Sequence, residues 1–220
     1  MKNRRFYLLC SFLSNVLIFV MAFYAVGMSF REHARGVYQE SGWATFRYFT
    51  TDSNLLCGLA SLLTAGFSLP MLLGKTERVP RSILLLKYFG TCAVSLTFTV
   101  VILFLGPVFG YGSMYGDASF YMHGVIPILA MVSWIVFDRG YRPKLWAVPA
   151  AMVFVAVYGI VYYFQVVIRG VSHGGWRDFY AFTHGGKWWL SILLIGIGAA
   201  ILCILMLFLH NRCDREKPGE

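Results

Sequence analysis

Six apolar stretches, each about 20 residues long, divide this sequence. They cover residues 6–28, 53–73, 82–109, 120–137, 145–168 and 188–209, to within a few residues. The hydrocarbon core of a bilayer is ~30 Å thick, and an α-helix needs roughly 20 apolar residues to cross it. The sequence therefore predicts an all-α integral membrane protein: a six-transmembrane-helix bundle in a single domain, residues 1–210, followed by a cytoplasmic tail, residues 211–220.

The composition agrees with this class. Of the 220 residues, 58% are hydrophobic and only 13% are charged, which leaves too little polar surface for a soluble domain. The net charge of +9 does not indicate nucleic acid binding, because the charges lie in short clusters between the apolar stretches. Four of the five cysteines lie within apolar stretches and no C-x-x-C pair occurs, so we interpret them as small core residues.

The distribution of Lys and Arg predicts the orientation. One set of termini and loops carries twelve of these residues, three in each segment, and the other set carries six. Because cytoplasmic loops are richer in Lys and Arg, both termini are expected in the cytoplasm. The first stretch is too long for a signal peptide and lacks a small-residue cleavage site, so we expect a retained helix. The protein would then be multi-pass, in the inner or plasma membrane if bacterial.

A polar stretch stands at the outer start of the second predicted helix, in RYFTTDSNLL, residues 47–56. Thr51 or Asp52 could cap this helix, because their side-chain oxygens accept from free backbone N–H groups. Thr50 and Asn54 are four residues apart and share one helix face. The stretch is therefore either a helix cap with a packed asparagine or part of a ligand-facing or catalytic site.

His123 lies about one turn inside the fourth predicted helix, at a depth similar to that of Thr50. Polar groups inside a membrane segment are costly, and function is their usual explanation. Pro127 follows four residues later and lacks the N–H that would reach the His123 carbonyl, which loosens the helix at the imidazole. A packed or interfacial histidine remains the alternative.

The last outer loop, SHGGWRDFYAFTHGGKWW, residues 172–189, offers His173, Asp178 and His184 as candidate zinc ligands. No metal-binding spacing is present, and no metal is our primary expectation. The glycines suggest that the loop folds over an outer-facing pocket. Basic residues of this outer side could contact lipid headgroups or capture a substrate carboxylate; they are Arg35, Arg47, Arg169, Arg177 and Lys187. Lys87 is expected to extend from the third helix toward the cytoplasmic surface.

Two motifs stand out, YFTTDSNLL at 48–56 and HGVIPILAMVSWIVFD at 123–138. In these motifs, and in the order and spacing of its six spans, the sequence resembles the androgen-induced-protein family of six-helix membrane hydrolases, and its bacterial relatives most closely. The family cleaves fatty acid esters of hydroxy fatty acids with a threonine nucleophile and a histidine base. The resemblance implies that Thr50 is the nucleophile and His123 the base, and Thr51 stays open as the alternative nucleophile.

The sequence departs from the animal members of that family in three places. Their proline lies five residues after the histidine, whereas Pro127 lies four after His123. Their tyrosine-proline-aromatic stretch before the last helix corresponds to FYAF, residues 179–182, with Ala181 in place of the proline. His184 stands near the position where they have an acidic residue. These differences bear on the substrate more than on the fold.

The resulting hypothesis is a membrane-embedded threonine hydrolase that cleaves lipid esters. His123 would activate Thr50, Asn54 could stabilise the oxyanion, and Asp52 could orient the histidine. Arg47, Arg177 and His184 are candidates at the substrate entrance. The expected partners are a lipid or fatty acid ester and membrane lipids, with no cofactor and no nucleic acid, and the oligomeric state is left open. The alternatives are a non-enzymatic lipid-binding or transport bundle and a zinc-dependent membrane hydrolase.

Overall fold

The computed structural model describes residues 2–31 and 41–215, apart from the side chains of residues 2, 3, 184 and 215. Arg35 lies outside the described residues. Six helical segments are long and apolar enough to cross a membrane, which confirms the predicted six-span all-α class. They are Arg4–Arg31, Phe49–Leu72, Arg81–Phe109, Asp117–Phe137, Ala147–Arg169 and Trp188–Asp214. Within the described ranges no β-strand forms.

Three of the spans are single α-helices, and the other three contain π-helical turns. The continuous helices are α1 (Lys2–Arg31), α2 (Phe49–Leu72) and α9 (Trp188–Arg215). The third span joins α3 (Arg81–Val100) through a π-helical turn, η2 (Val101–Leu105), to α4 (Gly106–Phe109). The fourth comprises α6 (Asp117–Phe120), η3 (Tyr121–Val125), α7 (Ile126–Val132) and η4 (Ser133–Phe137). The fifth comprises α8 (Ala147–Tyr163) and η5 (Phe164–Arg169).

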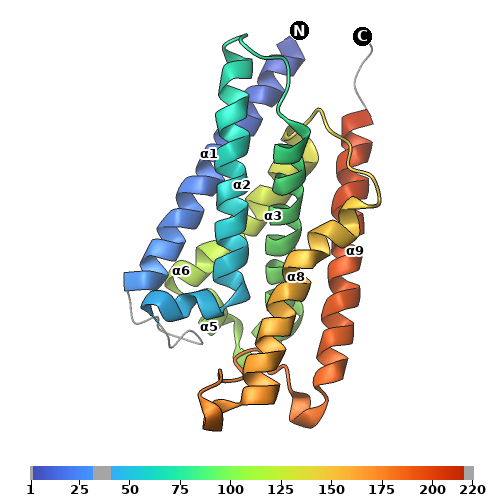
Figure 1. Ribbon diagram of the computed structural model, residues 1–220. Coiled ribbons are helices and arrows are strands. Elements are labelled where there is room, and N and C mark those ends of the chain that lie inside the picture. The colour runs from blue at the N-terminus through green and yellow to red at the C-terminus, as the bar shows by residue number, and fades with distance from the viewer. Residues whose placement is uncertain (1, 32–40, 216–220) are drawn as a thin grey trace.

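Short helical turns make up most of the described connections. They are η1 (Gly42–Arg47), α5 (Tyr111–Met114), η6 (Val171–His173) and η7 (His184–Gly186). The start of α1 and the end of α9 lie at the same end of the bundle, as do the α2–α3 and η4–α8 connections (Figure 1). We call this the terminal end. The opposite end holds η1, α5, η6 and η7 (Figure 1), and we call it the loop end.

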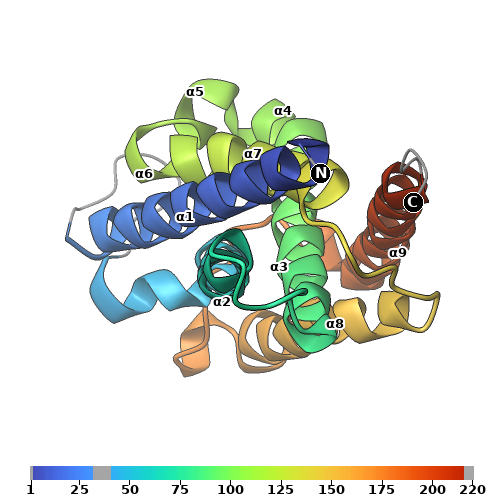
Figure 2. The same ribbon diagram turned by 90° about the horizontal axis from the view of Figure 1, so that it is seen from above.

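Helix α3 is the central element of the bundle. It packs against α2, α7, α8 and α9, and its span is the most buried of the six. Viewed along the bundle, α1 lies between α2 and the α5–α7 region, while α8 and α9 lie on the other side of α3 (Figure 2). A central helix with neighbours on all sides carries little lipid-facing surface, and α3 accordingly has many small and hydroxyl side chains inside the bundle.

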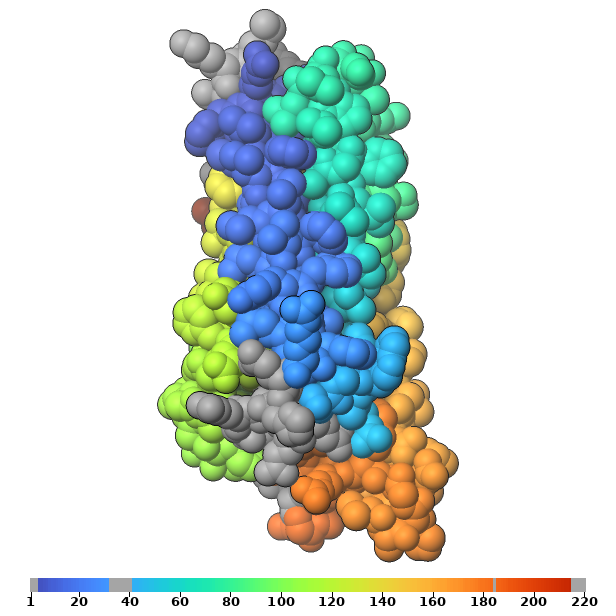
Figure 3. Space-filling view, turned by 90° about the vertical axis from the view of Figure 1, so that its left-hand side faces the viewer, coloured from blue at the N-terminus to red at the C-terminus, as the bar shows by residue number. Residues whose placement is uncertain are grey.

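The outer surface of α1 forms the middle of one face of the molecule, between α2 and the α5–α6 region (Figure 3). Its exposed side chains are apolar along most of its length. They include Phe6, Leu9, Leu13, Leu17, Val20 and Phe23. Such a surface is stable in contact with lipid chains and not with water.

Small residues bring α1, α2 and α3 close together. A Cβ added at Gly90 of α3 would lie 2.8 Å from the Cα of Cys57 in α2, and one added at Gly58 would lie 2.8 Å from the Cβ of Ala22 in α1. In membranes, helix association depends on such close packing, because lipid is as apolar as the side chains. These contacts fix how α2 stands between its neighbours.

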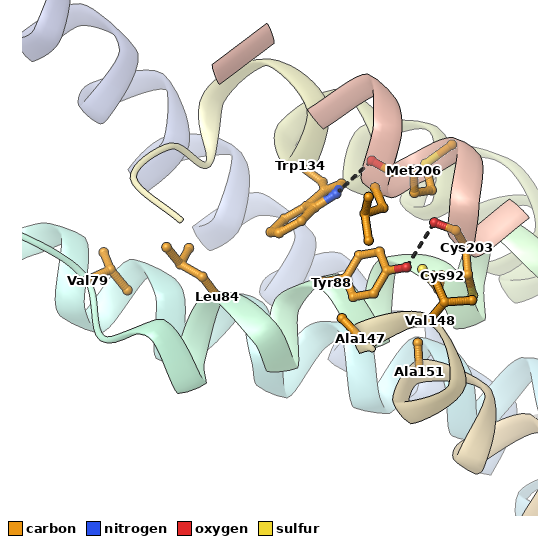
Figure 4. Close-up of a cluster of buried hydrophobic side chains, with 11 residues drawn as sticks. Val79, Leu84, Tyr88, Cys92, Trp134, Ala147, Val148, Ala151, Cys203 and Met206 are labelled. Carbon is orange, nitrogen blue, oxygen red and sulfur yellow. Dashed lines mark hydrogen bonds between the residues drawn. The ribbon is translucent and has the colours of Figure 1, made fainter. Parts of the chain in front are cut away.

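A second packing centre joins α3, η4, α8 and α9 toward the terminal end (Figure 4). The hydroxyl of Tyr88 donates to the carbonyl of Cys203 at 2.8 Å, and the indole N–H of Trp134 donates to the carbonyl of Met206 at 3.3 Å. His210 stacks on Trp134 with ring centroids 3.9 Å apart. Polar tips that reach partners allow these large rings to be buried without cost from unpaired groups.

The buried ionisable side chains include Lys87 and Asp138, whose burial was not predicted from the sequence. Lys87 is fully buried, and its Nζ donates to Ser61 Oγ at 2.8 Å, so the expectation that it extends to the cytoplasmic surface is wrong. The reason is that Lys87 faces α2 and not lipid or water. Asp138, 1% exposed, accepts hydrogen bonds from Ser11 at 2.6 Å, Asn15 at 2.7 Å and Ser133 at 3.0 Å.

Candidate active site

The start of α2 builds one side of the candidate site. The helix begins at Phe49, four residues before the predicted start, and its N-cap is Tyr48, without a side-chain cap. The prediction that Thr51 or Asp52 caps the helix is therefore wrong, because both already lie within its first turn. The backbone N–H of Phe49 instead donates to the hydroxyl of Tyr180 at 2.9 Å. A side chain from the last loop thus satisfies a free N–H of the helix terminus.

The two adjacent threonines have different surroundings. Thr50 is buried, and its Oγ1 lies 3.4 Å from Nε2 of His123. Thr51 is also buried, but its Oγ1 pairs with Oγ1 of Thr45 in η1 at 3.2 Å. One residue of helix rotates a side chain by about 100°, which directs the two hydroxyls to different neighbours. Of the two, the structure brings Thr50 to the histidine.

His123 stands in the π-helical turn η3, directly before α7. The loosening expected from Pro127, which is the second residue of α7, takes the form of this widened turn. His123 is fully buried, and its Nδ1 lies 2.6 Å from the carbonyl oxygen of Met114. A carbonyl oxygen only accepts, so Nδ1 carries the proton and Nε2 presents a lone pair to Thr50. This is the tautomer that a base acting on Thr50 requires.

Asn54 connects the two helices that hold Thr50 and His123. Its Nδ2 donates to the carbonyl of Thr50 at 2.8 Å and to the carbonyl of Met122 at 3.1 Å. An amide group has two hydrogens, and both are used. The expectation that Asn54 donates to an oxyanion is therefore wrong in this geometry, and Asn54 instead positions the two backbones.

Asp52 lies in the first turn of α2, where its charge is favourable to the helix dipole. The side chain is half-buried. In the described part of the chain no hydrogen bond joins it to His123, whose Nδ1 and Nε2 face Met114 and Thr50. The carbonyl of Met114 orients the imidazole, in place of the carboxylate that the sequence suggested.

A cavity of about 420 Å³ opens on the other side of Thr50. This volume is in the range of small-molecule sites, roughly 300–1,000 Å³. Its walls come from the start of α2, the end of α3 with η2, α8, the 180–182 loop and α9, and most of the lining side chains are apolar. The lining residues of α9 extend from Ser191 to Leu202, eleven positions or about 16 Å of helix. The cavity is therefore elongated along the bundle and suits a hydrocarbon chain.

The cavity also reaches the lipid-facing surface. Two of its lining residues, Leu103 in η2 and Leu194 in α9, are 72% and 58% exposed. Both lie within predicted membrane spans. A ligand could thus enter sideways from the bilayer, between η2 and α9.

The last loop closes the cavity at the loop end, as its glycines suggested, through Tyr180 and Phe182. The candidate entrance residues Arg47 and Arg177 are not among the cavity lining, and the side chain of His184 lies outside the described residues. The carbonyl of Arg47 accepts from the Tyr158 hydroxyl at 2.7 Å. Arg47 and Arg177 therefore do not form the wall of the cavity.

Two of the three candidate zinc ligands, Asp178 and His173, are engaged in local hydrogen bonds. Asp178 accepts from Tyr162, Phe182 and Thr183, and Nδ1 of His173 lies near Ser172 Oγ and the Arg169 carbonyl. Among the side chains that the structure describes, no three His, Cys, Asp or Glu residues gather into a metal-binding group.

Sequence reasoning missed two contributors to this site, the hydroxyl of Tyr180 and the carbonyl of Met114. Tyr180 lies within the FYAF stretch, which the family resemblance had marked only as a departure. A tyrosine in a Gly-rich outer loop was the only signal available in the sequence, and the left-handed conformation of the next residue, Ala181 at φ 51°, is seen only in the structure. The Met114 carbonyl left no signal, because a main-chain group has no residue identity to read.

The chain matches no protein-family model, no curated protein and no solved structure. Its function is therefore inferred from the geometry of the site together with the two sequence motifs.

Proposed function

We propose that the protein is a membrane-embedded threonine hydrolase of lipid esters, with Thr50 as nucleophile and His123 as base. The observation that carries the proposal is the position of the Thr50 hydroxyl. Its oxygen lies 3.4 Å from Nε2 of His123, and Thr50 also lines an elongated apolar cavity that reaches lipid. A nucleophile, its base and a chain-binding space thus meet at one residue.

The proposed reaction follows from this placement. His123 Nε2 takes the Thr50 proton while Oγ1 attacks the ester carbonyl carbon, and the Met114 carbonyl stabilises the imidazolium through Nδ1–H. The C–O bond to the alcohol then breaks, and the alcohol leaves with the proton from Nε2. Water, deprotonated by the same nitrogen, hydrolyses the acyl-threonine and releases the fatty acid. The 3.4 Å separation of Thr50 and His123 is slightly longer than the roughly 2.6–3.2 Å of a working pair, as is common before substrate binds.

The substrate class follows from the cavity. Its apolar walls favour an acyl chain, and the ester group would lie at Thr50 near the loop end. The resemblance to the androgen-induced-protein family adds the proposal that the leaving alcohol is a hydroxy fatty acid. The distribution of Lys and Arg supports a bundle with both termini in the cytoplasm, which places the reaction at the outer membrane face.

The test uses purified protein in lipid nanodiscs, with a chromogenic medium-chain ester and a fatty acid ester of a hydroxy fatty acid. Thr50→Ala and His123→Ala should each lower kcat by about 10³-fold or more, since a hydroxyl without its base is a poor nucleophile. An activated fluorophosphonate should label the wild-type chain at Thr50, as read by peptide mass spectrometry.

Thr51→Ala is the matched control, because Thr51 is an equally buried threonine one residue away whose hydroxyl pairs with Thr45. It should keep turnover within a few-fold of wild type. Wild-type turnover in folded Thr50→Ala and His123→Ala would refute the proposal, and loss of turnover only in Thr51→Ala would reassign the nucleophile.

A lipid-binding or transport bundle is the second candidate, and one observation favours it. Lys87 is fully buried within the third membrane span, and intramembrane charges often mark transport pathways. Uptake of a fluorescent fatty acid into proteoliposomes separates the two functions. Uptake that Lys87→Met abolishes, in a protein without esterase activity, would support transport.

Esterase activity that chelators abolish and Zn²⁺ restores would instead support the zinc-dependent alternative.

A further inference from the structure

The segment from Asp178 to Thr183 holds Tyr180 against the start of α2. The Asp178 carboxylate accepts from the backbone N–H groups of Phe182 and Thr183, both at 2.8 Å, from Thr183 Oγ1 at 2.7 Å and from the Tyr162 hydroxyl at 3.1 Å. Burial raises the pKa of this carboxyl, but the bonds from Thr183, Phe182 and Tyr162 outweigh it, so the net pKa lies below its ordinary value. The carboxylate therefore stays charged and keeps the segment in one conformation.

The Tyr180 hydroxyl lies at the junction of this segment, α2 and the cavity. Its oxygen accepts the N–H of Phe49 at 2.9 Å, it interacts with Thr50 and with the Tyr158 hydroxyl, and it lines the cavity together with Thr50. The hydrogen of Tyr158 goes to the Arg47 carbonyl at 2.7 Å, so Tyr158 does not need to donate to Tyr180. The phenol oxygen accepts from Phe49, and the phenol hydrogen remains available for an acceptor beside Thr50.

A chain of hydrogen-bonding groups runs through Thr50. Phe49 N–H donates to the Tyr180 oxygen, the Tyr180 hydroxyl interacts with Thr50, and, with Nδ1 of His123 protonated, the Thr50 O–H donates to Nε2. When Oγ1 uses a lone pair to attack a carbonyl carbon, it becomes a much weaker acceptor than the oxyanion that forms on that carbon. The phenol hydrogen is then free for the oxygen that becomes negative on that same carbon, next to Oγ1.

We infer that Tyr180 is a catalytic residue that donates a hydrogen bond to the oxyanion of the tetrahedral intermediate. The inference rests on the proposed threonine hydrolase function. As Thr50 Oγ1 bonds to carbon, the carbonyl π electrons move to oxygen, the threonine proton moves to Nε2 of His123, and Tyr180 keeps its own proton while sharing it with the oxyanion. Asn54 does not compete for this role, because both its amide hydrogens are used.

Two further features suit Tyr180 to this role. Burial, the largest cause, raises the pKa of its hydroxyl above the ordinary value, so the group remains a donor throughout the pH range of an assay. The N–H of Phe49 at the start of α2 donates to the phenol oxygen, and this polarises the O–H and strengthens it as a donor.

The experiment compares Tyr180→Phe with Tyr88→Phe in nanodiscs. Tyr88 is the matched control, a fully buried tyrosine whose hydroxyl bonds a main-chain carbonyl in a different packing centre (Figure 4). Tyr180→Phe should lower kcat about 10²–10³-fold, the typical cost of losing one oxyanion donor, with little change in KM. A long-chain trifluoromethyl ketone, which forms an oxyanion adduct, should bind more weakly by a similar factor, while binding of the fatty acid product stays as in wild type. Tyr88→Phe should leave all three measurements near wild type.

Near-wild-type kcat in Tyr180→Phe, alongside an inactive Thr50→Ala, would overturn the role of Tyr180 and leave the proposed function standing. Equal weakening of fatty acid and ketone binding would reduce Tyr180 to a structural residue. An increase in kcat would mean that the phenol blocks the site. Wild-type protein that neither turns over esters nor binds the ketone would overturn both proposals.

A second variant covers the case in which Tyr180→Phe does not fold. Difluorotyrosine at position 180 keeps the phenol oxygen for Phe49 but makes the hydroxyl more acidic. Its kcat should decline as rising pH ionises the phenol, within a range where the wild-type kcat is flat, because a phenolate cannot donate. A profile parallel to that of wild type would count against the inference.

Discussion

At the scale of single residues, Thr50 and Thr51 have the same side chain, and only their neighbours separate them. Thr50 faces His123 and the cavity, whereas Thr51 faces Thr45 in η1. The neighbours also decide the roles of Asn54 and Asp52, which the sequence suggested as supporting catalytic groups. Asn54 donates both amide hydrogens to the backbone carbonyls of Thr50 and Met122. The imidazole of His123 bonds the carbonyl of Met114 and not the carboxylate of Asp52.

Asp138 is a residue whose removal should cost stability without touching the site. Its carboxylate accepts three side-chain donors from Ser11, Asn15 and Ser133, at the end of the bundle opposite Thr50. Asp138→Ala would remove the shared acceptor, although Asn15 keeps the Ser11 carbonyl at 2.9 Å and Ser133 keeps the Ser14 hydroxyl at 3.0 Å. The Ser11 hydroxyl would be left buried and unpaired, so we expect the free energy of unfolding, measured in SDS or by heating, to fall by about 1–3 kcal/mol.

Glu77→Ala is the control for that prediction, because its side chain is exposed and such changes stay within roughly ±0.5 kcal/mol. Equal stability of the two variants would contradict the structural role given to Asp138. Esterase activity per folded molecule should be similar in both.

At the scale of elements, the packing of α2 against α3 depends on Gly90. Its position has no room for a methyl group, because the nearest atom, at 2.8 Å, belongs to the α2 backbone and cannot rotate away. The same two helices meet through Ser53 and Thr97, whose hydroxyls lie 3.0 Å apart beside the site. Separation of the helices would therefore also move Thr50.

Gly90→Ala should destabilise the bundle by about 1–3 kcal/mol, the usual cost of overpacking. Gly66→Ala is its counterpart on the exposed face of α2, where an added Cβ meets nothing within 4 Å. It should stabilise α2 by up to about 1 kcal/mol, since alanine is the better helix former. Thermal unfolding of both variants checks the prediction, which fails if they shift in the same direction.

The π-helical turns belong to this scale as well. η3 places His123 where an unbroken α-helix would have turned it differently, and η2 brings Leu103 to the cavity. Pro127 explains the first of these turns through its missing N–H. Pro107, the second residue of α4, explains the second turn in the same way.

At the scale of the whole molecule, the cavity is a product of four separate spans and a loop. Its long axis follows α9, so the distance that the cavity extends along α9 should set the longest acyl chain that it can hold. Gly198 lines the cavity seven residues beyond Ser191, about 10 Å of helix, and an added Cβ there meets no neighbour within 4 Å.

Gly198→Leu should therefore shorten the cavity. We expect kcat/KM for a long-chain ester to fall by about 10-fold or more, as a few lost methylene contacts imply, while an acetate ester is hydrolysed as before. Gly196→Leu is the control, because Gly196 has equal space but does not line the cavity. A chain-length profile unchanged in Gly198→Leu would place the acyl chain elsewhere.

The sequence by itself determined the six spans, the all-α class and the two polar positions at Thr50 and His123. It could do so because the length and apolarity of a membrane helix are local properties, and a polar residue within one is conspicuous.

Only the tertiary structure decided which groups meet. The sequence could not reveal that Lys87 faces Ser61, that Asn54 is fully engaged, or that Tyr180 and the Met114 carbonyl complete the site. These contacts depend on the rotation and depth of helices far apart in the chain, and the close approach at Gly90 and the turn at η3 set both. A hydrogen bond depends on a few tenths of an ångström, and helix periodicity alone does not fix positions to that precision.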